Sequence, residues 1–204
     1  MNRTYFKEFI TFPDIAIMLL LFVPLMIYTT LNMLHIGTWI AFIIGMGTYA
    51  MSEYLFHRFL FHMKTPTNPF LLKTIKRLHF DHHLDPNNLK LLFLPLWFSL
   101  PNGLIAAGVF YLITGSTQLT IAFLSGLIAY FMYYEWKHYI AHKPIQPRTE
   151  MGKKMKKAHL WHHFKNENYW FGVTHTSIDK TFGTYKDQNS VEKSETARNL
   201  EKRA

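Results

Sequence analysis

The segments HRFLFH (57–62), HFDHH (79–83), HYIAH (138–142) and HLWHH (159–163) decide how this chain folds. In each half of the chain a pair of histidines precedes an HxxHH triplet, and 17 positions separate the pair from the triplet both times. Neutral imidazole is the commonest metal-donating side chain, and ten of them exceed what one ion can use. The sequence therefore predicts one unit used twice, with two metal ions. The candidate ligands are His57, His62, His79, His82, His83, His138, His142, His159, His162 and His163.

The basic residues are distributed very unevenly. Lys and Arg are absent from residues 8–57 and again from 91–136, although the chain contains 22 of them. A membrane-spanning helix needs roughly 20 apolar residues, and a basic residue at its centre costs about 2.5–3.5 kcal/mol. Each gap is long enough for two spans. The expected fold is an all-α integral membrane protein with four transmembrane helices, at about 14–35, 36–56, 91–114 and 118–138.

The loop charges predict the orientation in the membrane. Positive residues accumulate in cytoplasmic loops, and the turns after the first and third spans carry none. We therefore expect a multi-pass protein with both termini, and all ten clustered histidines, on the cytosolic side. The predicted organisation is a cytosolic N-terminus (1–13), one membrane-embedded domain (14–186) and a mobile polar tail (187–204).

The histidines are expected on helices. Residues 45–62 contain no helix breaker, so the second span is predicted to continue past the bilayer, and the fourth span does the same through His138 and His142. A proline-containing turn then leads to an amphipathic stretch, at 68–84 and at 149–164, that ends in the triplet. Positions i, i+3 and i+4 of a helix point the same way, so each triplet is expected to offer several donors to one cavity. The result is a four-helix core with a cytosolic helical cap that holds a histidine-rich dimetal site.

Other polar residues are candidates to support the ligands. Glu53 and Glu135 each lie about one turn before a clustered histidine, where a carboxylate can orient the ring through its other nitrogen. The polarity of a helix end explains both residues equally well. Asp81 and His175 are further possible supporting residues, although His175, like His35, lacks the cluster spacing and is not predicted to bind metal.

The composition narrows the chemistry. The chain has no cysteine, which excludes disulfides, thiolate ligands and iron–sulfur clusters. Its formal charge is +9, and the basic residues lie on either side of the apolar segments. The chain has no nucleic-acid-binding motif, so anionic lipid headgroups rather than nucleic acid are the expected counter-charge. Imidazole suits iron, zinc or copper, whereas soluble di-iron bundles rely mainly on carboxylates. We therefore expect two all-nitrogen iron sites that use O2 against a C–H bond of a lipid, and zinc can occupy them in purified protein.

The four histidine segments resemble the HxxxxH, HxxHH, HxxxH, HxxHH signature of the fatty acid hydroxylase superfamily, whose members are integral-membrane di-iron oxygenases. Three other segments are similar to the fatty acid 2-hydroxylase branch: HHLDPNNLKLLFLP (82–95), YYEWKHYIAH (133–142) and FGVTHTSIDKTFGT (171–184). The resemblance covers about residues 49–185. It implies that the ten clustered histidines are the metal ligands and that the substrate is a lipid acyl chain, hydroxylated at the 2-position. No catalytic residue beyond the ligands is predicted.

The sequence departs from the family pattern at two positions, and neither is a ligand. Asp81 replaces the small residue usual before the paired histidines, and His175 stands where the family tends to have serine. The sequence also has no fused cytochrome b5-like domain. We therefore expect electrons from a separate cytochrome b5-like protein, ferredoxin or reductase, which could dock on the basic cytosolic face. The short chain, without an organelle-retention ending, favours a bacterial inner membrane over the endoplasmic reticulum.

Two alternative functions stay open at this point. A carotenoid or sterol hydroxylase or desaturase could use the same site. In a different class, a histidine-rich membrane protein could carry metal or bind haem. A carrier predicts ligands spread along a path at mid-membrane depth, whereas an oxygenase predicts that they converge.

Overall fold

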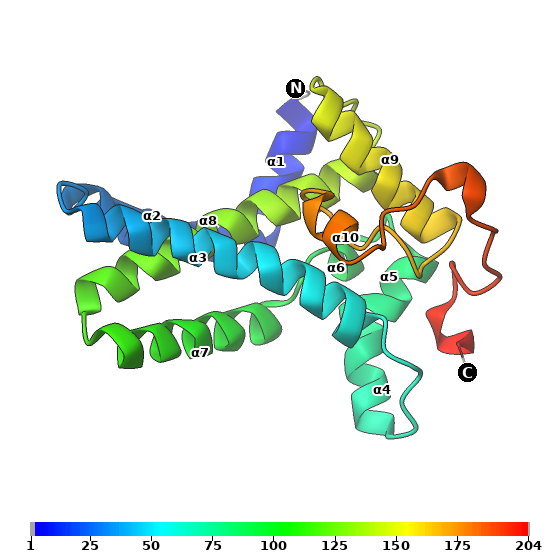
Figure 1. Ribbon diagram of the computed structural model, residues 1–204, viewed down its shortest axis with the longest axis horizontal. Helices are drawn as coiled ribbons and strands as arrows, with labels where there is room; N and C mark the ends of the chain where they lie inside the picture. The colour runs from blue at the N-terminus through cyan, green and yellow to red at the C-terminus, as the bar shows by residue number, and fades with distance from the viewer. Residues whose placement is uncertain (1–2, 204) are drawn as a thin grey trace. The chain divides into compact units, whose positions relative to one another are not determined.

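Helices are the only regular elements in the part of the chain that the structure describes. The computed structural model describes residues 3–203, and every regular element among them is a helix (Figure 1). The all-α prediction is therefore confirmed. The α-helices are α1 (Arg3–Thr11), α2 (Pro13–Leu31), α3 (Ile36–Leu55), α4 (Pro69–Ile75), α5 (Asp81–Leu84), α6 (Leu89–Leu92), α7 (Leu96–Thr114), α8 (Thr117–His142), α9 (Glu150–Phe164) and α10 (Ser177–Thr181). The π-helical turns are η1 (Phe56–Phe61) and η2 (Lys76–Phe80), and the 3-10 turns are η3 (Gln188–Ser190) and η4 (Leu200–Lys202).

The chain divides into two compact units. Unit 1 comprises Met1–Ala50 and Leu94–Glu135, and unit 2 comprises Met51–Phe93 and Trp136–Ala204. Helices α3 and α8 contribute residues to both units. The expected single domain over 14–186 stays a prediction.

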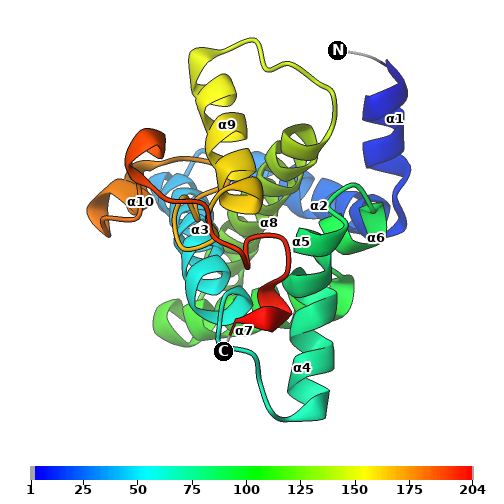
Figure 2. The same cartoon turned by 90° about the vertical axis from the view of Figure 1, so that its right-hand side faces the viewer.

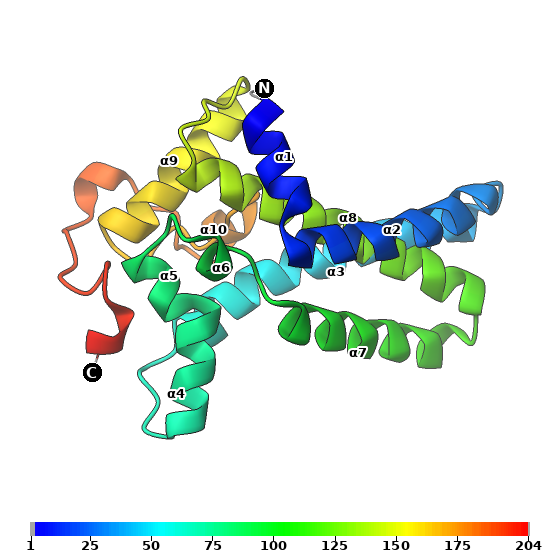
Figure 3. The same ribbon diagram turned by 180° about the vertical axis from the view of Figure 1, so that it is seen from behind.

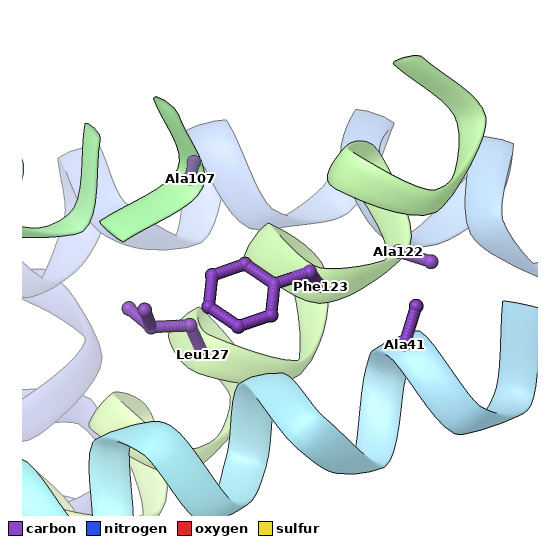
Figure 4. Close-up of a cluster of buried hydrophobic side chains, with 5 residues drawn as sticks. All are labelled: Ala41, Ala107, Ala122, Phe123 and Leu127. Carbon is purple, nitrogen blue, oxygen red and sulfur yellow. The ribbon is translucent and has the colours of Figure 1, made fainter. Parts of the chain in front are cut away.

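In unit 1 the backbones of α3 and α8 approach closely through two glycines. A Cβ atom on Gly45 would lie 2.0 Å from the carbonyl oxygen of Phe123, and one on Gly126 would lie 2.0 Å from that of Phe42. Any larger residue would push the helices apart, and small residues at such contacts are typical of helices that pack within a bilayer. A buried cluster surrounds this contact (Figure 4): Ala41, Ala107, Ala122, Phe123 and Leu127.

Helix α2 packs along α8 in the same unit (Figure 3). The hydroxyl oxygens of Thr29 and Ser125 lie 2.8 Å apart in a buried hydrogen bond. Met18 packs with Ile128 and Phe131. The polar pair fixes the register of α2 against α8, because an unpaired hydroxyl is costly where water is excluded.

The outer surface of unit 1 is strongly apolar. Leu31, Leu112 and Ile113 are 76%, 84% and 77% exposed. Among the described residues, the helical stretches Pro13–Leu31 and Leu89–Thr114 are long and apolar enough to cross a membrane. Only 17% and 11% of the most apolar part of each stretch is buried, whereas a helix at the centre of a globular core is mostly buried. Exposed apolar area of this extent marks a surface that contacts lipid or another protein.

The other two expected spans coincide with α3 and α8, but these helices are less apolar. Glu53 lies near the end of α3, and α8 contains Gln118 and Glu135. These polar residues lower the mean hydropathy of the two helices. Two spans therefore have the required composition, and four transmembrane helices stay a prediction.

Unit 2 contains the helices that carry the two triplets (Figure 2). The side chain of Asn68 accepts a hydrogen bond from the amide of Leu71 at 3.0 Å, and that of Thr149 accepts one from the amide of Gly152 at 3.1 Å. Each cap satisfies an amide that the first helical turn leaves without a partner. The chain is helical without interruption over residues 69–84 and again over 150–164. Both predicted stretches therefore begin where their caps and prolines indicate.

The C-terminal segment is packed, and the prediction of a mobile tail over 187–204 was wrong for the part described, 187–203. Val191, Ala197 and Leu200 are buried, and Val191 contacts the buried side chains of Ala158 and Trp170. The high average polarity of the segment hides these apolar residues, which are spaced so that the charged ones between them stay in solvent. Drawn in red in Figure 2, the segment lies against α5.

Candidate metal centre

The ten clustered histidines converge into two groups of five in unit 2. Within each group the candidate ligand nitrogens all lie within 4.8 Å of one another. All of the rings are buried except that of His142, which is partly buried. His35 is exposed, and neither it nor His175 belongs to a group. Group 1 contains His57, His62, His79, His83 and His162, and group 2 contains His82, His138, His142, His159 and His163.

Each triplet is divided between the groups: two of its three histidines serve one group, and the third serves the other. The first and third histidines of a triplet join the pair of their own repeat, and the middle one, His82 or His162, joins the other group. On a helix of about 100° per residue, positions i and i+4 lie about 40° apart, whereas i+3 and i+4 lie about 100° apart. The exchange brings the groups into contact, and the rings of His83 and His163 stack with centroids 4.0 Å apart.

The two pairs reach their groups through different helix types. His57 and His62 are five residues apart, which would leave their side chains about 140° apart on an α-helix. The chain widens into the π-helix η1 at this point. Hydrogen bonds from i to i+5 bring residues five apart back to one face, and the two ring centroids are 5.0 Å apart. His138 and His142 are four residues apart, so the α-helix α8 alone brings their ring centroids to 5.1 Å.

Backbone carbonyls orient three rings of group 1. A carbonyl oxygen can only accept a hydrogen bond, so the Nδ1 atom that faces it carries the hydrogen. In the neutral ring the Nε2 atom then presents a lone pair, which is the metal-binding form. The Nδ1 atoms of His57, His83 and His162 donate to the carbonyl oxygens of Phe171, Ala197 and Tyr169 at 2.5, 2.7 and 2.7 Å.

The spacing of the Nε2 atoms fits a metal ion in each group. His79 Nε2 lies 3.2, 2.9 and 3.0 Å from the Nε2 atoms of His57, His62 and His83. One nitrogen carries at most one hydrogen, so it cannot donate to all three. With metal–nitrogen bonds of about 2.0–2.1 Å, two ligands at a right angle lie about 2.9 Å apart.

Two pairs of Nε2 atoms in group 2 lie at similar distances from each other. The Nε2 atoms of His138 and His82 are 3.0 Å apart, and those of His142 and His159 are 2.8 Å apart. Facing lone pairs at these distances repel each other unless a cation or a proton lies between them. The donor set of each group is therefore suited to a cation.

Burial keeps the imidazoles neutral. It lowers the pKa of His57 to about 4 and that of His83 to about 3. Burial, followed by the charge of neighbouring rings, lowers the pKa of His79 and His163 well below its usual value. Metal binding near neutral pH therefore needs no displacement of a proton from these rings.

The carboxylates expected to orient rings hold backbone amides instead. Glu53 Oε1 accepts from the amides of Val173 and Thr174 at 2.7 and 3.0 Å, and its Oε2 accepts from the Thr174 hydroxyl at 2.7 Å. Glu135 Oε1 accepts from the amide of Leu94 at 3.0 Å. Each carboxylate lies one helical turn from a ligand, but the nearest donors in space are amides of distant segments.

The two other supporting candidates also have other partners. Asp81 lies 3.7 Å from the ammonium group of Lys76 at the surface. His175 Nδ1 lies 3.0 Å from the hydroxyl of Thr174. Adjacency in sequence to a ligand or to a motif did not predict these contacts.

Asp179, which the histidine pattern does not predict as a supporting residue, supports a ligand through the backbone. Its buried carboxylate accepts from the amides of Phe171 and Gly172 at 2.9 and 2.8 Å and from the hydroxyl of Thr184 at 2.6 Å. These bonds fix the loop whose Phe171 carbonyl orients His57. The signal was available, because Asp179 is the one carboxylate within the FGVT-to-FGT segment.

Helices that gather ten histidines into two adjacent groups define a class of all-helical proteins able to hold two metal ions. The sequence model of the fatty acid hydroxylase family matches residues 42–184, which include all ten histidines. The chain belongs to this family.

Named relatives and a solved structure agree with this assignment. A dihydroceramide fatty acyl 2-hydroxylase of Arabidopsis thaliana is 34% identical over 152 residues, which are 74% of this chain and 61% of the relative. A fatty acid 2-hydroxylase of Rattus norvegicus is 34% identical over 70% of this chain and 38% of its own length. The chain thus spans less than two thirds of the length of each of these relatives. The fold is similar to that of full-length scs7p, of which only the hydroxylase domain is visible, with a TM-score of 0.77 and 24% identity over 87% of this chain and 68% of that one.

Proposed function

We propose that this chain is a membrane oxygenase that hydroxylates a lipid acyl chain at carbon 2, with one iron ion in each histidine group. The observation that carries the proposal is the convergence of ten imidazoles into two adjacent groups of five. The names of the relatives, which include a fatty acid 2-hydroxylase and a dihydroceramide fatty acyl 2-hydroxylase, support the substrate class and the position.

The reaction balances with O2 and an external donor of two electrons. The C–H bond at carbon 2 is replaced by a C–O bond to one oxygen atom, and the other oxygen leaves as water with two protons. A bound pair of irons would supply the activation of O2 for this step. A separate cytochrome b5-like protein, ferredoxin or reductase would supply the electrons.

The residues of the chain hold the ions and exclude water. Group 1 and group 2 supply five neutral nitrogens each, and the ligands alone are proposed to act at the reacting centre. Burial of the rings keeps water and protons away from them. The donor set also suits zinc, so purified protein can contain zinc in place of iron.

The proposed setting is a membrane. Four helices are proposed to cross it, with both termini in the cytosol and a bacterial inner membrane as the location. The exposed apolar surfaces of Pro13–Leu31 and Leu89–Thr114 support two of these spans. The absence of Lys and Arg from residues 8–57 and 91–136 supports all four.

The arrangement of the ligands favours an oxygenase over a metal carrier. A carrier needs successive sites along a path, each weak enough to release its ion. Here the ligands form two groups whose rings stack on each other through His83 and His163. No observation favours a carotenoid or sterol substrate.

Lipid analysis of whole cells tests the proposal. Cells that express the chain should accumulate acyl lipids heavier by one oxygen atom, with the new hydroxyl at carbon 2. The His79→Ala variant should abolish this product, because His79 Nε2 contacts three other ligand nitrogens of group 1. The matched control is His35→Ala, which removes an exposed histidine outside both groups. Identical lipids in cells with and without the protein, in the presence of O2 and a donor, would contradict the proposal.

A further inference from the structure

The C-terminal strap, residues 194–203, contacts two ligands of group 1 through its backbone and its arginines. The carbonyl oxygen of Ala197 accepts from His83 Nδ1 at 2.7 Å. Arg198 donates to the carbonyl oxygens of His83 and Leu84 at 3.2 and 3.0 Å. The ring and the backbone of His83 are therefore both held by the strap.

Arg203 holds a second ligand of the same group. Its Nη1 atom donates to the carbonyl oxygen of His62 at 3.0 Å and lies 3.3 Å from His62 Nδ1. Its Nη2 atom donates to the side-chain oxygen of Asn168 at 3.1 Å, and its Nε atom lies 3.8 Å from the buried carboxylate of Glu167. The planar guanidinium thus joins His62 to the turn that follows α9.

Independent contacts anchor the strap. The Leu200 side chain is completely buried. The Thr196 hydroxyl donates to Glu167 at 2.5 Å, and the Thr65 hydroxyl lies 3.0 Å from the carbonyl oxygens of Glu201 and Arg203. These contacts offset the conformational entropy lost when the segment is ordered. The strap is therefore a built part of unit 2.

Group 2 has no comparable support. Among residues 3–203, the buried Nδ1 atoms of the group 2 ligands His82, His159 and His163 have no hydrogen-bond partner. We infer that the C-terminal strap is a positioning element for the metal of group 1 alone, acting through His62 and His83. This inference rests on the proposed function, because it requires that each group holds an ion.

Arg203 is the residue through which to test the inference. Loss of a group that orients a ligand lowers metal affinity by about 10–100-fold. The full chain, loaded with ferrous iron, is mixed with a ferrous chelator, and the release of the two ions is followed in time. The Arg203→Ala variant should release one iron at least about tenfold faster than the parent and the other at the parent rate.

Two further variants separate positioning from folding. Lys202→Ala removes a neighbouring exposed cation and should release both ions at the parent rate. A chain that ends at Asn199 lacks Arg203 and the Leu200 anchor and should reproduce the fast release. Circular dichroism of each variant reports whether the helices are retained.

A structure of the half-stripped Arg203→Ala protein assigns the ion that leaves. The inference predicts metal density within group 2 and none within group 1. Density lost from group 2, equal acceleration of both ions, or release at the parent rate would each overturn the inference and leave the proposed function standing. A parent chain that binds no iron at all would overturn the proposed function, and this inference with it.

Discussion

The two histidine groups are alike in their ligands and different in what surrounds them. Each has five nitrogens, taken from a pair, the outer two positions of a triplet and the middle position of the other triplet. In group 1 backbone carbonyls hold the Nδ1 atoms of three rings. In group 2 three buried Nδ1 atoms have no partner among the described residues. A repeat in the sequence can therefore duplicate the ligands without duplicating their support.

The difference arises from the segments that follow the triplets. The chain after the second triplet supplies the carbonyls of Tyr169, Phe171 and Ala197, all of which orient rings of group 1. The chain after the first triplet supplies none of these three carbonyls. Group 1 thus depends on long-range folding of the C-terminal region, and group 2 depends on it much less.

The largest expected effect comes from the ligands that the triplets exchange. His82→Ala and His162→Ala each remove the middle histidine of one triplet, and each should reduce hydroxylation to background, because both ions are needed. Metal analysis of the purified variants should show that each loses iron from the group opposite to its own repeat. Wild-type activity in either variant would contradict the exchange.

The second largest effect should come from a residue that supports group 1 without being a ligand. Asp179→Ala leaves two amides and one hydroxyl without their acceptor, at a cost of about 3 kcal/mol or more in the free energy of unfolding. Denaturant unfolding measures this change. The matched control is Asp187→Ala, which removes an exposed aspartate that accepts from the amide of Asn189 and should cost about 1 kcal/mol or less. Equal losses in the free energy of unfolding would show that Asp179 supports the fold no more than an exposed aspartate does.

Acid should weaken the metal-free chain through the buried rings. His57, with a folded pKa of about 4, and His83, with one of about 3, bind protons in the unfolded state at higher pH than in the folded state. Their contribution to stability is therefore complete above pH 6.5 and is lost as the pH falls toward 4 and then 3. Thermal unfolding of the metal-free protein between pH 7 and pH 4 measures this loss. A melting temperature that does not change over this range would contradict neutral burial of the two rings.

The smallest effects should be equal in the two repeats. Asn68→Ala and Thr149→Ala each remove one helix cap, and each should cost about 1 kcal/mol. The same unfolding experiment measures both. A large difference between the two costs would show that the repeats are not equivalent at their helix caps.

The histidine spacing predicted most of what is local. Helix periodicity and caps gave the stretches that end in the triplets, and the chemistry of imidazole gave the ten candidate ligands. The division of the triplets was missed because a helix was treated as having one face, although i+3 and i+4 diverge enough to reach two sites. The π-helix at η1 was missed because HRFLFH has no composition that distinguishes it from an α-helix, and only the five-residue spacing points to it.

The remaining errors concern contacts between distant segments. Glu53 was a candidate to orient a ring one turn away, with the polarity of a helix end as the alternative, and the sequence did not show that it binds the amides of Val173 and Thr174. The tail was assigned as mobile from its average polarity, although its few apolar residues are enough to pack it. Such contacts depend on where the chain returns after many residues, 120 of them between Glu53 and Val173, which periodicity cannot show.

The most direct test of the account is a structure of the iron-loaded chain with anomalous scattering measured at the iron edge. The account predicts two neighbouring iron peaks. The first should be bound by His57, His62, His79, His83 and His162, and the second by His82, His138, His142, His159 and His163. A single peak, no peak, or two irons each bound by all three histidines of one triplet would contradict it.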